Sequence, residues 1–288
     1  MKLVLLLGLI AIIASLTGCA SHHHADGTHA ALWKGSRIVY DSVGGSRTNI
    51  VFVHGWASSR TFWQEQMSGL QDEDTRLIAI DLVGHGDSDA PEITYTMDVF
   101  ADNIAAVMND AGVEDAILVG HSMGTPVVRQ FYRRYPSRTK ALILVDGGLR
   151  PLGSPEQAKQ MAAPFYTDGW RDYMGQMIDM MASSMDVAWR ERIKEAAIST
   201  PQHVVTGGFE AMQDESLWGT DPIKVPVLAI HANAPFWNDD YQAFVRSFIP
   251  DLTWRMWDGV SHFLFVDRPE EFNQEVRAFC NRLENDND

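Results

Sequence analysis

The sequence predicts an α/β protein with a mostly parallel, doubly wound sheet. Residues 49–53, 116–119 and 141–145 are apolar at nearly every position, which is typical of strands buried on both faces. Stretches with a helical apolar period separate such runs, as residues 97–111 do. Strands that alternate with helices are joined by crossovers, and crossovers favour parallel pairing. The length of the chain suits one domain with a large core and an insertion.

The amino terminus indicates an export signal. Lys2 precedes an apolar run over residues 3–16 that is too short to cross a bilayer comfortably. The following Leu16-Thr17-Gly18-Cys19 resembles the bacterial lipobox, which implies a signal peptide over residues 1–18 and a lipid such as palmitate on Cys19. By the same resemblance, Ala20 implies sorting to the outer membrane. We therefore expect an envelope lipoprotein, bound to the membrane through Cys19 and facing the periplasm.

The composition limits which classes of partner and ligand we expect. A net charge of −15 repels phosphate backbones, so no nucleic-acid partner is predicted, and it leaves membrane attachment to the lipid. The only other cysteine is Cys280, so lipidation of Cys19 excludes an internal disulfide. Residues 19–30 contain several histidines among small and polar residues and are expected to form a tether. No second ligand group accompanies them, and neither a metal site nor a cofactor is predicted.

The middle of the chain breaks the alternation. Residues 150–220 contain no clear strand and are helical in pattern, so we expect a helical cap inserted into a core formed by residues 31–149 and 221–288. One predicted helix has an apolar stripe, which we interpret as a packing face whose flexible thioethers could also contact apolar ligands. This stripe comprises Met174, Met177, Ile178, Met181 and Met185.

The segment Gly120-His121-Ser122-Met123-Gly124 has the form of a nucleophile elbow. It follows the apolar run 116–119 and precedes a helical pattern with Pro126 in its first turn, where a proline is tolerated. The tight turn of an elbow strains the nucleophile's backbone, and the two glycines leave room where a Cβ would collide with neighbouring chain. Ser122 is therefore the candidate nucleophile.

The chain resembles α/β-hydrolase-fold enzymes of the esterase and haloperoxidase-like group over residues 38–283, apart from the cap. The motifs that carry the resemblance are His54-Gly55-Trp56, the elbow, and Gly259-Val260-Ser261-His262-Phe263 followed by Arg268-Pro269-Glu270-Glu271-Phe272. The resemblance implies Ser122 as nucleophile and His262 as its base, since His262 follows the last strand. It also implies an oxyanion hole made of the backbone N–H groups of Trp56 and Met123. The Trp56 side chain would form either a wall of the acyl pocket or its rim.

The resemblance leaves open which carboxylate is the acid partner of His262. The family most often has it after the strand at 225–230, where this sequence has Ala232-Asn233-Ala234-Pro235-Phe236 and no carboxylate before Asp239. Some members instead take the acid from the strand that follows the elbow helix, and Asp146 ends that strand here. We predict Asp146, with Asp239 or Asp240 as the alternative.

The resemblance implies a serine hydrolase that cleaves a small to medium carboxylic ester through an acyl-enzyme on Ser122. Acyl transfer, perhydrolysis and C–C bond hydrolysis on the same residues are alternatives, as is a surface lipoprotein that binds without catalysis. The cap's Phe165, Tyr166 and Trp170 suggest an apolar small-molecule substrate. The sequence predicts no oligomeric state.

Overall fold

A computed structural model describes residues 26–45, 47–151 and 153–285. The predicted signal peptide, Cys19 and the first part of the predicted tether lie outside these residues. No helix in the described ranges is long and apolar enough to cross a membrane.

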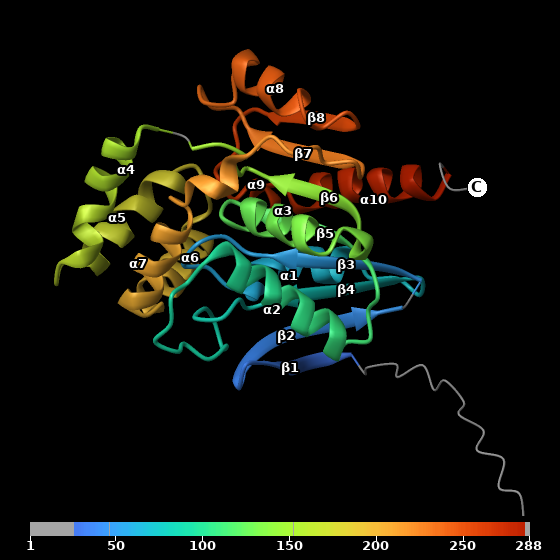
Figure 1. Cartoon of the computed structure of the whole chain (residues 1–288), viewed down its shortest axis with the longest axis horizontal. Helices are drawn as coiled ribbons and strands as arrows, with labels where there is room; N and C mark the ends of the chain where they lie inside the picture. The colour runs from blue at the N-terminus through green and yellow to red at the C-terminus, as the bar shows by residue number, and fades with distance from the viewer. Residues whose placement is uncertain (1–25, 46, 152, 286–288) are drawn as a thin grey trace, which may run out of the picture.

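One sheet of eight strands forms the centre of the molecule, in the order β1-β2-β4-β3-β5-β6-β7-β8 (Figure 1). Strands β1 and β2 pair antiparallel, β2 also runs antiparallel to β4, and all other pairs are parallel. The predicted α/β class with a mostly parallel sheet is confirmed. The strands are β1 (Gly27–Trp33), β2 (Ser36–Gly44), β3 (Thr48–Val53), β4 (Thr75–Ile80), β5 (Ala116–His121), β6 (Thr139–Val145), β7 (Val227–Ala232) and β8 (Leu252–Trp257).

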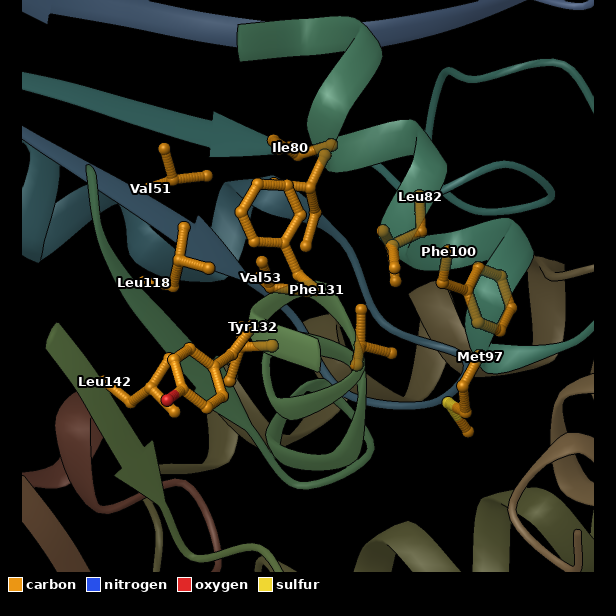
Figure 2. Close-up of a cluster of buried hydrophobic side chains, with 14 of the residues drawn as sticks. Val51, Val53, Ile80, Leu82, Met97, Phe100, Leu118, Phe131, Tyr132 and Leu142 are labelled. Carbon is orange, nitrogen blue, oxygen red and sulfur yellow. The ribbon is translucent and has the colours of Figure 1, made fainter. Parts of the chain in front are cut away.

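Helices cover both faces of this sheet, which is why its inner strands are apolar throughout. On one face, Phe131 packs over Val51 and Val53 of β3, and Phe100 lies beside Leu82 and Met97 in the same cluster, as Figure 2 shows. That face carries α2 (Met97–Asp110), α3 (Gly124–Arg134) and α8 (Asp239–Arg246). The opposite face carries η1 (Arg60–Trp63), α1 (Gln64–Gly69), α9 (Leu264–Asp267) and α10 (Pro269–Asn285). The short η2 (Pro136–Arg138) links α3 to β6.

Further helices lie between β6 and β7 in the chain and gather beyond the carboxyl ends of the strands (Figure 1). They are α4 (Pro155–Ala162), η3 (Ala163–Tyr166), α5 (Trp170–Met181), α6 (Val187–Ser199), α7 (Gln202–Ala211) and η4 (Glu215–Trp218). The methionine stripe lies on α5 and just beyond it. Met174, Ile178 and Met185 are buried in the core, and Met177 and Met181 pack against it. These side chains serve packing.

Strand β1 begins earlier than the sequence analysis predicts. Residues 27–30, expected in the tether, pair with β2 from Gly27 opposite Ser42 onward. At this edge of the sheet no side chain before Ala31 is buried, so the apolar alternation that indicates a strand is missing there. The backbone hydrogen bonds between β1 and β2 form without this apolar alternation.

A buried ion pair connects the loops that follow β3 and β4. Arg60 of η1 pairs with Asp81, whose side chain is fully buried, and also with Asp87 at 2.9 Å and Asp41 at 3.1 Å. The Arg60 backbone N–H donates to Asp81 Oδ1 at 2.7 Å, and Asp87 N–H donates to Oδ2 at 2.9 Å. Burial raises the pKa of Asp81, and Arg60 opposes that shift. The carboxylate thus depends on Arg60 for its charge.

Replacing Arg60 by methionine is expected to destabilise the fold by about 3–5 kcal/mol, because it leaves the charge of Asp81 buried without its partner. The free energy of unfolding in urea measures this loss. Arg37→Met is the matched control: its pair with Asp89 is 58% and 44% exposed, and such pairs contribute up to ~1 kcal/mol. Equal losses in the two variants would contradict a special role for the buried pair.

Candidate active site

Ser122 lies in a strained turn between β5 and α3. Its φ of +53° is in the left-handed region that residues with a Cβ rarely adopt. Two hydrogen bonds fix the turn: Ser122 N–H donates to Val145 O at 2.9 Å, and the Thr125 hydroxyl donates to Gly120 O at 3.0 Å. A Cβ on Gly124 would lie 2.6 Å from Val53 O, so only glycine fits there without displacing the backbone. This is the strand–turn–helix context that the motif predicts.

The structure brings His262 to Asp146. The imidazole Nδ1 lies 2.6 Å from Asp146 Oδ2, and this contact joins the loop after β8 to the end of β6. Asp146 is buried and also has a positive φ, of +44°. The alternative acids Asp239 and Asp240 are exposed in the first turn of α8. Because Nδ1 faces the carboxylate, Nε2 is the ring nitrogen left to take a proton.

Two donors, one at the end of β7 and one in the segment that follows it, bind the other oxygen of Asp146. The Ala232 backbone N–H and the Trp237 indole N–H each donate to Oδ1 at 3.0 Å. The His231 Nδ1 lies 3.7 Å from the same oxygen. Burial by itself would raise the pKa of Asp146, but His231 and His262 beside the carboxylate outweigh it and place the pKa well below its usual range. The sequence analysis missed Trp237, because no motif marks an aromatic residue that donates to a distant carboxylate.

The loop after β3 lies against the nucleophile. Gly55 packs so closely that a Cβ on it would come within 3.1 Å of Ser122 Cβ. The next residue is Trp56, and the residue after the nucleophile is Met123, at the start of α3. Neither of these two backbone N–H groups donates a hydrogen bond to another described residue. Both are available to an oxygen bound beside Ser122.

The Trp56 side chain neither walls nor rims the cavity that holds Ser122. Its indole N–H donates to Val205 O of α7 at 2.8 Å, and its ring packs on Phe165 and Phe209. The residue thus ties the loop after β3 to the cap. The position of the Trp56 side chain depends on its packing against α7, which lies far along the chain, so the local motif could not predict it.

Other histidines near the site are buried and uncharged. Burial lowers the pKa of His54 to about 4 and that of His85 and His121 to about 3. The His121 ring lies 4.6 Å from the His262 ring, tilted by 46°, and its Nε2 donates to the His262 carbonyl at 2.9 Å, which fixes the loop backbone. His262 keeps 21% of its side chain exposed and faces the cavity. Of these imidazoles, it is therefore the one that a bound molecule can reach.

Ser122, Asp146 and His262 line one cavity of 470 Å³. Its other walls are largely apolar and include Met123, Met161, Phe209, Met212, Trp218 and Phe236. Of the three cap aromatics expected near the substrate, Phe165 and Trp170 are buried in the core, and Tyr166 is largely exposed and lines a neighbouring void. In the described ranges, no group of three or more His, Cys, Asp and Glu side chains is placed to bind a metal ion.

Comparisons with known proteins agree with this fold. Residues 48–176 match the family model described as the alpha/beta hydrolase fold. A non-heme chloroperoxidase from Streptomyces lividans is 26% identical over 255 residues, covering 80% of this chain and 90% of that protein. A bifunctional esterase/perhydrolase from Acinetobacter calcoaceticus is 38% identical over 103 residues, covering 36% of this chain and 37% of that protein.

Among solved structures, an esterase from a Rhodococcus species is similar, with a TM-score of 0.74 and 28% identity. The match covers 89% of this chain and 99% of that esterase. The chain is therefore a protein of the α/β-hydrolase fold, with esterases and haloperoxidases among its relatives.

Proposed function

We propose that this protein is a serine hydrolase that cleaves carboxylic esters through an acyl-enzyme on Ser122. The observation that carries the proposal is the 2.6 Å contact between His262 and Asp146 in the cavity that also holds Ser122 on its strained turn. A serine hydroxyl is a weak nucleophile until a neighbouring base takes its proton, and His262 has the free ring nitrogen for this step. Asp146 fixes the tautomer and stabilises the imidazolium without accepting the proton.

The proposed reaction has two halves. Ser122 Oγ attacks the ester carbonyl while His262 Nε2 takes the hydroxyl proton, and the N–H groups of Trp56 and Met123 stabilise the oxyanion. Collapse of this intermediate breaks the bond to the leaving alkoxide, which takes the proton from His262 and departs as an alcohol. Water then gives a proton to His262 and attacks the acyl-enzyme. The second collapse releases the carboxylic acid and returns the proton to Ser122.

Labelling with a fluorophosphonate tests the proposal against a protein that binds without catalysis. The probe phosphonylates an activated serine, so it is expected to label the purified protein once, at Ser122, as mass spectrometry of the modified peptide would show. Ser122→Ala is expected to abolish labelling, whereas Ser68→Ala, which changes an exposed serine on α1, leaves it intact. Failure of the unmodified protein to react would favour the binding alternative.

The assignment of the acid makes a separate prediction. Asp146→Asn is expected to lower kcat on p-nitrophenyl acetate by about 10³–10⁴-fold, because the amide stabilises the wrong histidine tautomer. Asp239→Asn changes a solvent-exposed carboxylate on α8 and is expected to retain nearly full activity. Circular dichroism would confirm that both variants fold. The opposite ranking of the two variants would remove Asp146 from the proposed mechanism.

A further inference from the structure

The cavity at Ser122 adjoins a second void of 820 Å³. The two voids share lining residues, among them Ala158 of α4, Phe209 of α7 and Trp218 of η4, and we call the place where these residues lie the junction. Ser122, Asp146 and His262 line the first void, and none of them lines the second. We call the second void the cap groove, because α4, η3, α7 and η4 supply most of its lining. Ligand pockets commonly measure about 300–1,000 Å³, so each part alone is large enough for a substrate group.

The walls of the cap groove suit an unbranched apolar chain. Ala158, Ala162 and Ala163 supply small apolar surfaces, and Phe209 and Trp218 supply aromatic surfaces. The charged residues that line the groove are exposed to solvent: Lys159, Glu210, Asp214 and Glu215. The Tyr166 hydroxyl donates to Glu210 at 2.5 Å and so links η3 to α7.

The position of His262 decides which part of an ester enters the cap groove. The imidazolium gives its proton to the leaving oxygen, so the alcohol portion must lie beside His262. Phe236 and Trp237 line the cavity together with His262, but none of these three lines the cap groove. The acyl portion stays bonded to Ser122 through the intermediate and points away from the departing alcohol. The groove is therefore the continuation of the acyl side.

We propose that the cap groove binds the linear acyl chain of the substrate, a proposal that rests on the ester hydrolysis proposed above. The preferred substrates are then esters of medium- to long-chain fatty acids rather than of acetic acid. Each methylene that moves from water into the groove contributes binding free energy that converts to at most about fourfold in kcat/KM.

A series of p-nitrophenyl esters with acetyl, hexanoyl and decanoyl groups tests this proposal below their critical micelle concentrations. The value of kcat/KM is expected to rise along the series. Ala158→Phe, which fills the junction, is expected to lower kcat/KM for the decanoate by about tenfold or more and to leave the acetate within about twofold. Gln160→Phe adds the same ring to α4 at an exposed residue that lines neither void, and is expected to behave as wild type.

Three outcomes would overturn the acyl-chain proposal while sparing the hydrolase. These are a flat chain-length profile, an unchanged profile in Ala158→Phe, and a stronger dependence on alcohol length in a series of alkyl acetates. Each of them leaves fluorophosphonate labelling at Ser122 intact. A protein that neither hydrolyses any ester of the series nor reacts with the fluorophosphonate would overturn both proposals.

The contacts of Trp237 carry a second and independent inference. Its indole is 2% exposed, lies 4.2 Å from the His231 ring, and donates to Asp146 Oδ1. The segment after β7 thus supplies a hydrogen-bond donor where related enzymes most often have the acid itself. Asn233 in that segment points elsewhere, because its side chain donates to Asp258 at 2.6 Å. We infer that Trp237 is a positioning residue that orients Asp146 toward His262.

Trp237→Phe keeps an aromatic ring and removes the donor. Its kcat is expected to fall about tenfold or more with KM unchanged, since a hydrogen bond to a charged group is lost. The acid limb of the kcat/KM profile is expected to move to higher pH, because a carboxylate with one donor fewer binds the imidazolium proton more tightly. The other titratable groups facing Asp146 are His121 and His231, and burial lowers the pKa of both.

Trp254→Phe is the matched control. Trp254 also lies beside His231, with the rings 4.4 Å apart, but its buried indole nitrogen has no hydrogen-bond partner in the described part of the chain. The Trp254→Phe variant is expected to keep the wild-type kcat and pH profile. The amplitude of the pre-steady-state burst gives the fraction of active protein in each variant, so that kcat can be corrected for unfolded protein. Equal losses in both variants, or a raised KM with unchanged kcat in Trp237→Phe, would show a packing role instead.

Discussion

The contact between His262 Nδ1 and Asp146 Oδ2 joins residues 116 positions apart in the sequence. It forms because parallel strands place their carboxyl ends at one edge of the sheet, where β5 delivers Ser122, β6 delivers Asp146 and the loop after β8 delivers His262. The rest of the site is arranged around this pair. His121 fixes the backbone of His262, while Ala232 at the end of β7 and Trp237 beyond it bind the second oxygen of Asp146.

Backbone strain is concentrated at the same edge. Ser122, Asp146 and Ala57, the residue after Trp56, all have positive φ values although none is a glycine. Such conformations cost on the order of 1–3 kcal/mol each and persist only where surrounding contacts fix them. Here Ser122 N–H donates to Val145 O and Asp146 N–H to Ile230 O, so each strained residue on a strand end is bonded to the neighbouring strand. The parallel sheet stabilises turns that would not form in isolation.

The sequence predicts those parts of the molecule that leave a local pattern. The inner strands are apolar because helices cover both faces, and the elbow is recognisable because its glycines and serine are neighbours in the chain. The start of β1 leaves no pattern, since its first residues pair through the backbone with exposed side chains. The donors to Asp146 leave no pattern either. Ala232 donates through its backbone N–H, which any residue but proline has, and no neighbouring residue marks the Trp237 indole as a donor to a distant carboxylate. The Trp56 indole bonds a cap helix whose position depends on the packing of the whole insertion.

Both ends of the described chain lie near the amino ends of the parallel strands β3 and β4, whereas Ser122 lies at the carboxyl ends of the strands. Asp26 accepts a hydrogen bond from Gly44 N–H, where β2 pairs with the start of β4, and Glu284 near the end of α10 contacts Thr48 at the start of β3. The cavity that holds Ser122 is lined by residues of the cap helices α4, α7 and η4, and Figure 1 shows these helices beyond the carboxyl ends of the strands. Immobilising the protein on a bead or electrode through either end would therefore leave the cavity mouth facing the solution.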